Sequence, residues 1–243
     1  MEQMQSNDAA ATMTPERGPY PGILPTIGFI ILYFTLQGLC TVLIMAATSD
    51  MAAKPTSMAI ISGLVGSAVI QLILMWLYLR KNDRIELLGL HDFGRIPLHK
   101  ATGLAFLLVV AAMIFNFLYA QYVIPGIGMQ DDMKKILAEI ARTPVNMAAM
   151  FVAIAIAAPL VEELLFRGFL QNALTKYVPV WGAIILSSFL FSLVHLQPYA
   201  IPGLMSLSLA FGYLYHRTGS LRTNILLHMA NNAFALFVSQ VLN

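Results

Sequence analysis

Two adjacent carboxylates and an arginine lie within one long apolar stretch of this 243-residue chain. Glu162 and Glu163 closely follow Pro159, and Arg167 comes one helical turn later. An ionised side chain at the depth of a membrane-spanning helix costs about 2.5–3.5 kcal/mol on insertion scales. Charges at such positions usually serve a function, and we therefore take this cluster as the candidate site.

The spacing within the cluster separates the roles of the two carboxylates. Glu163 and Arg167 are four residues apart with the acid first, which is the favourable order for an ion pair along a helix. Glu162 lies about 100° around the helix, so it is available for another task. Pro159 has no amide hydrogen and clashes with the carbonyl of Ala155, which predicts a kink or an opened backbone just before Glu162.

A histidine in the next apolar stretch is expected at the same level as Glu162. The turn between the two stretches is centred between residues 178 and 179, with Glu162 about sixteen residues before it and His195 about sixteen after it. At about 1.5 Å per residue, both side chains lie about 24 Å from the turn. The sequence therefore predicts that antiparallel packing brings Glu162 and His195 together.

The last apolar stretch carries His228 and Asn232, which share one helix face because they are four residues apart. Asn231 lies beside them, and Asn224 comes one turn earlier. A partly desolvated carboxylate next to a histidine can activate water as a general base. A second histidine and an asparagine amide can donate to the oxyanion of a tetrahedral intermediate. Together these groups suit the attack of water on a peptide carbonyl.

The same residue types allow a metal-dependent version of this chemistry. Glu162, His195 and His228 match the three-ligand set of a hydrolytic zinc site. On the residues alone, both mechanisms stay open.

The composition predicts that these groups are held by an all-α integral membrane protein. Hydrophobic residues make up 58% of the chain, charged residues only 11%, and the mean hydropathy is +0.75. A soluble domain carries about 25% charged residues. A net charge of +2 gives no reason to expect a nucleic-acid partner. We expect about seven membrane spans, or eight if one is hidden, at about 23–47, 57–79, 101–123, 145–176, 179–196, 202–215 and 222–242.

Residues 1–20 are predicted to form a flexible polar tail, and residues 21–243 a single membrane domain. Residues 130–142 have the pattern of a short amphipathic helix lying in the membrane interface. Basic residues in the loops after the second, fourth and sixth spans outnumber those in the opposite loops by eight to four. By the positive-inside rule, this predicts a multi-pass protein of the plasma membrane with a cytoplasmic N-terminus.

The polar side chains between positions 145 and 240 resemble the three motifs of the CPBP family. This family contains CAAX proteases and bacteriocin-processing enzymes. The motif EExxxR matches Glu162, Glu163 and Arg167, and HxxxN matches His228 and Asn232. The motif FxxxH matches Phe191 and His195. All three motifs occur in order, each in an apolar segment, which makes the resemblance specific.

The resemblance implies an intramembrane endopeptidase similar to the type II CAAX prenyl endopeptidases. Glu162 and His195 would activate water, His228 and Asn232 would bind the oxyanion, and the other two charged residues would support the site. The implied substrate is a membrane-associated or lipidated peptide or protein within the lipid bilayer. No cofactor is favoured, because a glutamate can activate water without zinc.

Two other functions are compatible with these residues. A membrane protein that keeps this fold without catalysis would act in bacteriocin immunity or in regulation. A proton-coupled transporter would use the intramembrane glutamate and histidines as a relay, although the chain lacks paired broken helices in two matching halves.

Overall fold

The computed structural model describes residues 21–47, 57–88, 94–125 and 143–241. The predicted tail and the predicted amphipathic helix lie outside these ranges. Within them the chain is helical and contains no strand, which confirms the expected all-α class. The elements, of which η2 and η3 are π-helical, are α1 (Ile23–Ala47), α2 (Ser57–Lys81), η1 (Ile85–Leu88), α3 (Leu98–Tyr122), α5 (Pro144–Met150), η2 (Phe151–Ala157), α6 (Ala158–Glu163), η3 (Leu164–Gln171), α7 (Asn172–Leu174), α8 (Val180–Leu193), η4 (Pro198–Ala200), α9 (Ile201–Thr218) and α10 (Leu221–Val241).

The seven predicted apolar stretches all form helices, but only some of these helices have the length and apolar composition needed to cross a membrane. Four of the described helices are long and apolar enough, namely α1, α2, α3 and the continuous helix from α5 to α7. Helix α8 has 14 residues, or about 21 Å, which is shorter than a hydrocarbon core of about 30 Å. Helices α9 and α10 are likewise not among these four. That α8, α9 and α10 cross the membrane stays a prediction.

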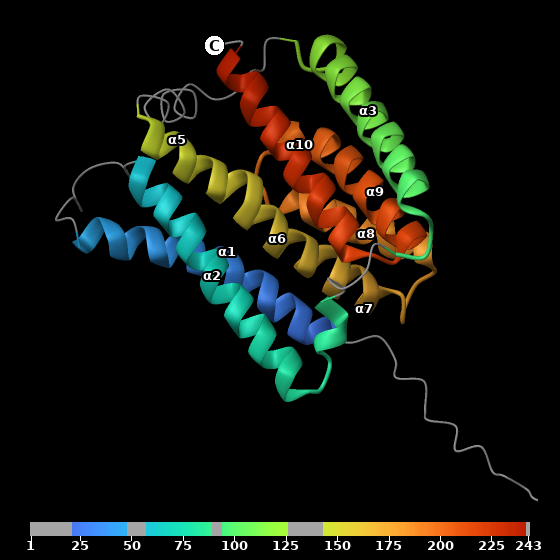
Figure 1. Cartoon of the computed structure of the whole chain (residues 1–243), viewed down its shortest axis with the longest axis horizontal. Helices are drawn as coiled ribbons and strands as arrows, with labels where there is room; N and C mark the ends of the chain where they lie inside the picture. The colour runs from blue at the N-terminus through green and yellow to red at the C-terminus, as the bar shows by residue number, and fades with distance from the viewer. Residues whose placement is uncertain (1–20, 48–56, 89–93, 126–142, 242–243) are drawn as a thin grey trace, which may run out of the picture.

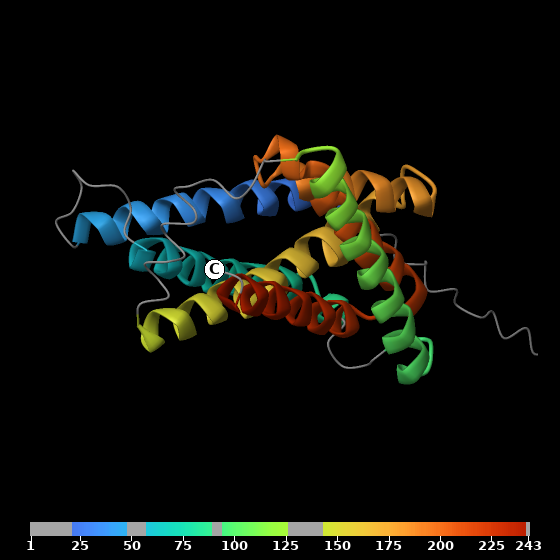
Figure 2. The same cartoon turned by 90° about the horizontal axis from the view of Figure 1, so that it is seen from above.

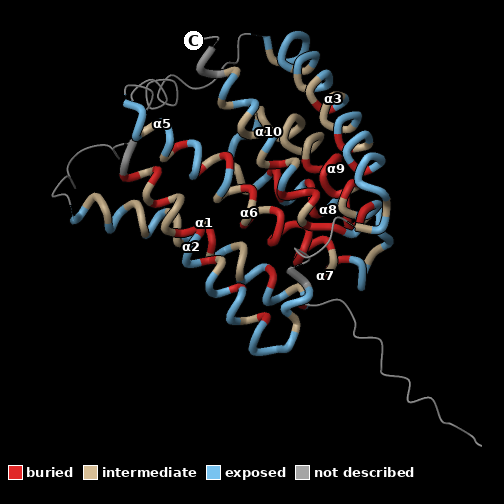
Figure 3. The backbone as a smooth tube through the Cα atoms, in the orientation of Figure 1, coloured by how far each residue is buried: buried red, intermediate tan, exposed pale blue. Residues whose placement is uncertain are grey.

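The helix that carries the two carboxylates runs through the middle of the molecule (Figure 1). The pair α1 and α2 lies on one side of it, and α3, α8, α9 and α10 lie on the other side, as the turned view also shows (Figure 2). Buried residues concentrate where α6, η3, α8, α9 and α10 meet, whereas α1, α2 and α3 are largely exposed along their outer faces (Figure 3). The most enclosed part of the fold thus surrounds the carboxylate cluster.

The first two helices approach each other closely at a glycine of α2. A Cβ atom on Gly63 would collide with the Thr41 side chain and lie 3.1 Å from the Thr41 backbone nitrogen. The buried amide of Gln71 on α2 also donates to the carbonyl of Phe29 on α1 at 2.9 Å. A small residue at a helix crossing and an interhelical hydrogen bond are the usual means of helix association in membranes.

Replacement of Gly63 by alanine is expected to weaken this crossing. The added methyl group has to push the α1 backbone away, and overpacking of this kind costs about 1–3 kcal/mol. We expect a lower unfolding temperature for Gly63→Ala in detergent. Gly28→Ala is the matched control, because a Cβ atom on Gly28 meets nothing within 4 Å. Equal unfolding temperatures for the two variants would contradict the close packing.

Candidate active site

A proline opens the backbone of the central helix just before the carboxylates. In the π-helical segment η2, the amide of Ala158 donates to the carbonyl of Ala153, five residues earlier. The next carbonyl in this pattern, that of Ile154, would require the amide hydrogen that Pro159 lacks. Instead, the side-chain amide of Asn232 on α10 donates to the Ile154 carbonyl at 3.0 Å. The predicted open backbone is present, and it anchors the candidate oxyanion-binding asparagine.

Glu163 and Arg167 form the ion pair that their spacing predicts, and both side chains are almost fully buried. The Arg167 Nε lies 3.3 Å from the Glu163 Oε2, and the exposed fractions of the two side chains are 1% and 0%. The second end of the guanidinium donates to the carbonyl and the hydroxyl of Ser208 on α9, at 3.0 and 2.8 Å. Its centre lies 5.0 Å from the ring of Phe191 and 5.6 Å from the ring of Phe211. Arg167 therefore ties the carboxylate helix to α8 and α9.

The imidazole of His228 lies between the two carboxylates. Its Nδ1 is 2.9 Å from the Glu163 Oε1, and its Nε2 is 3.8 Å from the Glu162 Oε2. Because a carboxylate can only accept, the short contact means that Nδ1 carries a proton and donates to Glu163. Glu163 also accepts from the Asn224 side chain at 3.2 Å. Glu163 thus forms an ion pair with a guanidinium and accepts hydrogen bonds from an imidazole and an amide, and it orients His228 towards Glu162.

Glu162 has a different environment from its neighbour. Its side chain is 14% exposed, and among the described residues it has no hydrogen-bond partner. The imidazole that it approaches is that of His228. The structure therefore leaves Glu162 as the carboxylate with free acceptor capacity beside a histidine.

His195 does not meet Glu162, in contrast to the expectation from equal distances to the turn. It lies beyond the end of α8, and its Nδ1 is 2.7 Å from the carbonyl of Phe191. The described part of the chain shows no hydrogen bond or ion pair between His195 and Glu162. The count of about sixteen residues assumed α-helical rise in both arms. Residues 164–171 are π-helical, and i→i+5 bonding changes both the rise and the direction of the side chains.

The two histidines instead flank one aromatic ring. The ring centre of Phe191 is 4.9 Å from that of His195 and 6.2 Å from that of His228. Because the Phe191 carbonyl accepts from Nδ1, the Nε2 of a neutral His195 has a free lone pair. The tautomer that this contact selects can accept a proton at Nε2.

The zinc alternative requires Glu162, His195 and His228 to meet. Within the described ranges, no three His, Cys, Asp or Glu side chains gather closely enough to hold a metal ion. These three residues, as arranged here, therefore do not fit the zinc site that their types suggest.

Comparison with known proteins finds one similarity, to a family model. Residues 144–234 match the family model described as Type II CAAX prenyl endopeptidase Rce1-like. The match covers less than half of the 243 residues, and we refer to this similar stretch as the Rce1-like segment. It contains all three motifs, so the match confirms the resemblance predicted from them. No curated protein and no solved structure matches the chain.

Several residues of the Rce1-like segment contribute to the site without having been predicted. Ser208 holds Arg167, and the Phe211 ring centre lies 4.7 Å from that of His228. The carbonyl of Phe211 also accepts from Asn224 at 2.7 Å. Serine and phenylalanine are common in apolar helices, so nothing in the sequence distinguishes these residues from ordinary packing. Only Asn224, one turn before His228, carried a usable signal.

An apolar groove adjoins the Rce1-like segment between α3 and α10. Its volume is about 460 Å³, and its walls are mostly aliphatic and aromatic side chains. Phe106 and Met113 line it from α3, and Leu227 and Asn231 line it from α10. The Asn231 amide lies 3.3 Å from the Asn232 side-chain oxygen. The groove lies on another face of α10 from His228 and Asn232, neither of which lines it.

Proposed function

We propose that the chain is an intramembrane endopeptidase that hydrolyses a peptide bond by water activated at Glu162. The observation that carries the proposal is the division of labour between the two carboxylates. Glu163 is fully engaged with Arg167, His228 and Asn224, whereas Glu162 is partly exposed and unbonded 3.8 Å from the His228 Nε2. A carboxylate in this position suits general-base chemistry.

In the first step, Glu162 takes a proton from a water molecule as the water oxygen bonds to the peptide carbonyl carbon. The carbonyl π electrons move to the oxygen. His228 with both nitrogens protonated donates through Nδ1 to Glu163 and through Nε2 to this oxyanion. The side-chain amide of Asn232 has two hydrogens, and it donates one of them to the Ile154 carbonyl. The second hydrogen is available to donate to the oxyanion. Hydrogen-bond donors that are held in position before the reaction make the largest contribution to transition-state stabilisation in many such sites.

In the second step, the tetrahedral intermediate collapses. The carbonyl re-forms, the carbon–nitrogen bond breaks, and the proton on Glu162 passes to the leaving amine nitrogen. His195 is the second group able to accept a proton from the water, through its Nε2.

The groove between α3 and α10 indicates the substrate class. Its apolar walls suit a lipid chain or an apolar peptide segment that arrives from the bilayer. A membrane-associated or lipidated protein is therefore the proposed substrate.

Hydrolysis is tested with purified protein and a library of membrane peptides, and with a proteomic comparison of cells that carry the wild type or Glu162→Ala. We expect cleavage products that depend on Glu162 in both experiments. Identical peptide patterns from the two proteins would refute the proposed function. Solute uptake into liposomes driven by a pH gradient, without cleavage, would support a transporter instead.

Removal of metal is expected to leave hydrolysis unchanged. The residues that would bind zinc do not assemble here, and the glutamate mechanism needs no metal. The measurement compares cleavage rates before and after exhaustive chelation, with the zinc content determined in both samples. Loss of activity on chelation and its recovery with added zinc would establish the zinc mechanism.

A further inference from the structure

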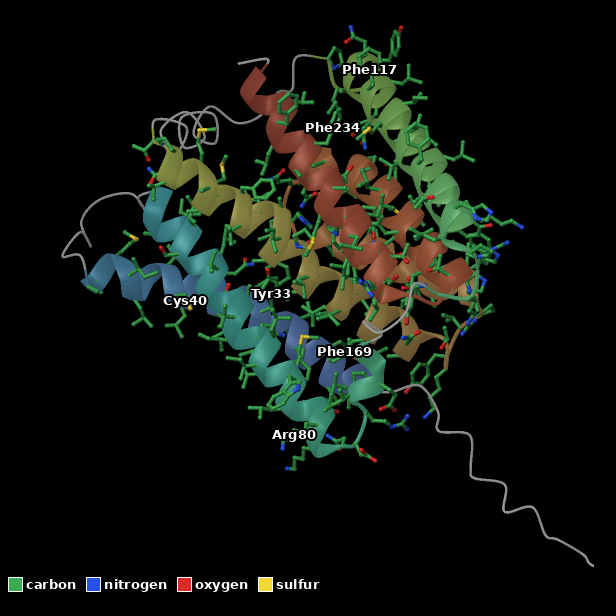
Figure 4. The ribbon with its side chains drawn as sticks, viewed as in Figure 1. Tyr33, Cys40, Arg80, Phe117, Phe169 and Phe234 are labelled. Atoms are coloured by element: carbon green, nitrogen blue, oxygen red, sulfur yellow. The ribbon has the colours of Figure 1, made fainter. Side chains whose placement is uncertain are left out.

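The groove between α3 and α10 has the dimensions of a site for a lipid acyl chain. Its wall on α3 extends from Leu98 to Met113, which is about 22 Å of helix at about 1.5 Å per residue. One leaflet supplies about 15 Å of a hydrocarbon core that is about 30 Å thick. Large side chains of the wall are open to the surroundings, with exposed fractions of 72% for Phe106, 51% for Leu226 and 53% for Phe234 (Figure 4). An exposed apolar surface of this kind marks a contact with membrane or with an apolar ligand.

Basic residues lie at the end of the groove where both helices begin. Arg95 precedes α3, Lys100 lies in the first turn of α3, and both are exposed. Arg222 lies in the first turn of α10, one turn before Leu226 of the groove wall. The amide of Arg95 donates to the carbonyl of Thr218 at 2.7 Å, which ties the start of α3 to the turn before α10. We call Arg95, Lys100 and Arg222 the basic end of the groove.

The helices next to the basic end contain no acid that could neutralise it. The sequence has no aspartate or glutamate between residues 94 and 122, nor after Glu163. These ranges include the whole of α3, α8, α9 and α10. A guanidinium has five N–H donors, so it can bind a phosphate in addition to its contacts within the protein. The basic end is thus complementary to an anionic headgroup.

Aromatic rings place the basic end at the surface of the bilayer. Trp181, at the start of α8, stacks on Tyr213 with 5.4 Å between the ring centres, and Arg217 lies over the same ring at 6.0 Å. Tryptophan and tyrosine beside basic residues are typical of the membrane interface. Arg217 is adjacent to Thr218, whose carbonyl accepts from Arg95. The basic end therefore lies at the depth of the lipid phosphates.

We propose that the groove binds an anionic phospholipid, with one acyl chain between α3 and α10 and the phosphate at the basic end. The orientation predicted from the basic loops puts this end in the cytoplasmic leaflet, which contains anionic lipids. Neither His228 nor Asn232 lines the groove, so the phospholipid is not the substrate and its binding does not rest on the proposed function. A substrate that brings its own lipid chain would have to displace this phospholipid.

Native mass spectrometry of the purified full-length protein tests the proposal. Phosphatidylglycerol and phosphatidylcholine with identical acyl chains are added in equal amounts, and the lipids retained by each chain are counted. We expect one phosphatidylglycerol per chain, retained in preference to phosphatidylcholine. A basic residue beside lipid phosphate contributes about fivefold in affinity, so Arg95→Gln and Arg222→Gln are each expected to lower the preference about fivefold. Arg80→Gln is the matched control, because Arg80 is an exposed residue of α2 that lies away from the groove (Figure 4).

Ala230→Phe tests the groove itself. Ala230 is an exposed residue of the groove wall, so the larger side chain fills the groove without entering the core. We expect this variant to lose the bound phosphatidylglycerol at an unchanged unfolding temperature. Ala111→Phe, at an exposed position of α3 outside the groove, is expected to keep the lipid.

Equal retention of the two lipids by the wild type would overturn the proposal, as would retention of phosphatidylglycerol by Ala230→Phe. A bound peptide or a second copy of this chain in place of the lipid would overturn it as well. Specific binding of phosphatidylglycerol by a protein that hydrolyses no peptide would keep the lipid site and refute the protease.

Discussion

Glu162→Gln is expected to abolish peptide hydrolysis while the protein stays folded. The amide has the shape of the carboxylate but cannot take a proton from water, and loss of a general base costs about 10²–10⁴ in rate. Among the described residues, Glu162 has no hydrogen-bond partner whose loss would destabilise the fold. We therefore expect a loss of about a thousandfold in kcat/KM and an unchanged unfolding temperature.

Glu86→Gln provides the matched control for this change. Glu86 lies on η1 with 57% of its side chain exposed, and its contact with Arg84 is long, at 3.9 Å. An exposed ion pair of this kind contributes little to stability, so both activity and unfolding temperature are expected to match the wild type. Substantial hydrolysis by Glu162→Gln would show that another group activates the water.

Arg167→Met is expected to have the largest effect on stability. It leaves the carboxylate of Glu163 fully buried without its guanidinium, and breaking a buried ion pair in this way costs about 3–5 kcal/mol. The change also removes the two hydrogen bonds to Ser208. In a chain of this size, we expect the unfolding temperature in detergent to fall by about 10 °C.

Arg80→Met is the corresponding control, because Arg80 is an exposed residue in the last turn of α2. The double variant Glu163→Gln, Arg167→Met is expected to recover part of the lost stability, since it leaves no buried charge at this pair. A single variant as stable as the wild type would show that the pair is not required for the fold. A double variant no more stable than Arg167→Met would locate the loss in the contacts with Ser208, Phe191 and Phe211.

The two replacements separate the carboxylates experimentally. Glu162 is expected to affect rate but not stability, and Arg167 is expected to affect stability first, through Glu163. Adjacent residues on one helix can have such different roles because a step of about 100° turns Glu163 into the core. The same step leaves Glu162 at the partly exposed edge of the site.

Local pattern in the sequence was sufficient for much of this protein. Runs of apolar residues predict the helices because each backbone hydrogen bond in a bilayer must be made within the helix. The four-residue spacing of Glu163 and Arg167 predicts their ion pair, since neighbours on a helix surface are set by the helix alone. Pro159 predicts the open backbone, because a missing amide hydrogen is a property of the residue itself.

Which groups meet across helices was decided only by the tertiary structure. The sequence indicated His195 as the partner of Glu162, but His228 occupies that place. The π-helical turns after Glu163 change the rise of the carboxylate helix, and no residue pattern in the sequence predicts these turns. The Ile154 carbonyl accepts from Asn232, and Arg167 donates to Ser208 on another helix. Such contacts depend on how whole helix faces pack, so a few local spacings cannot specify them.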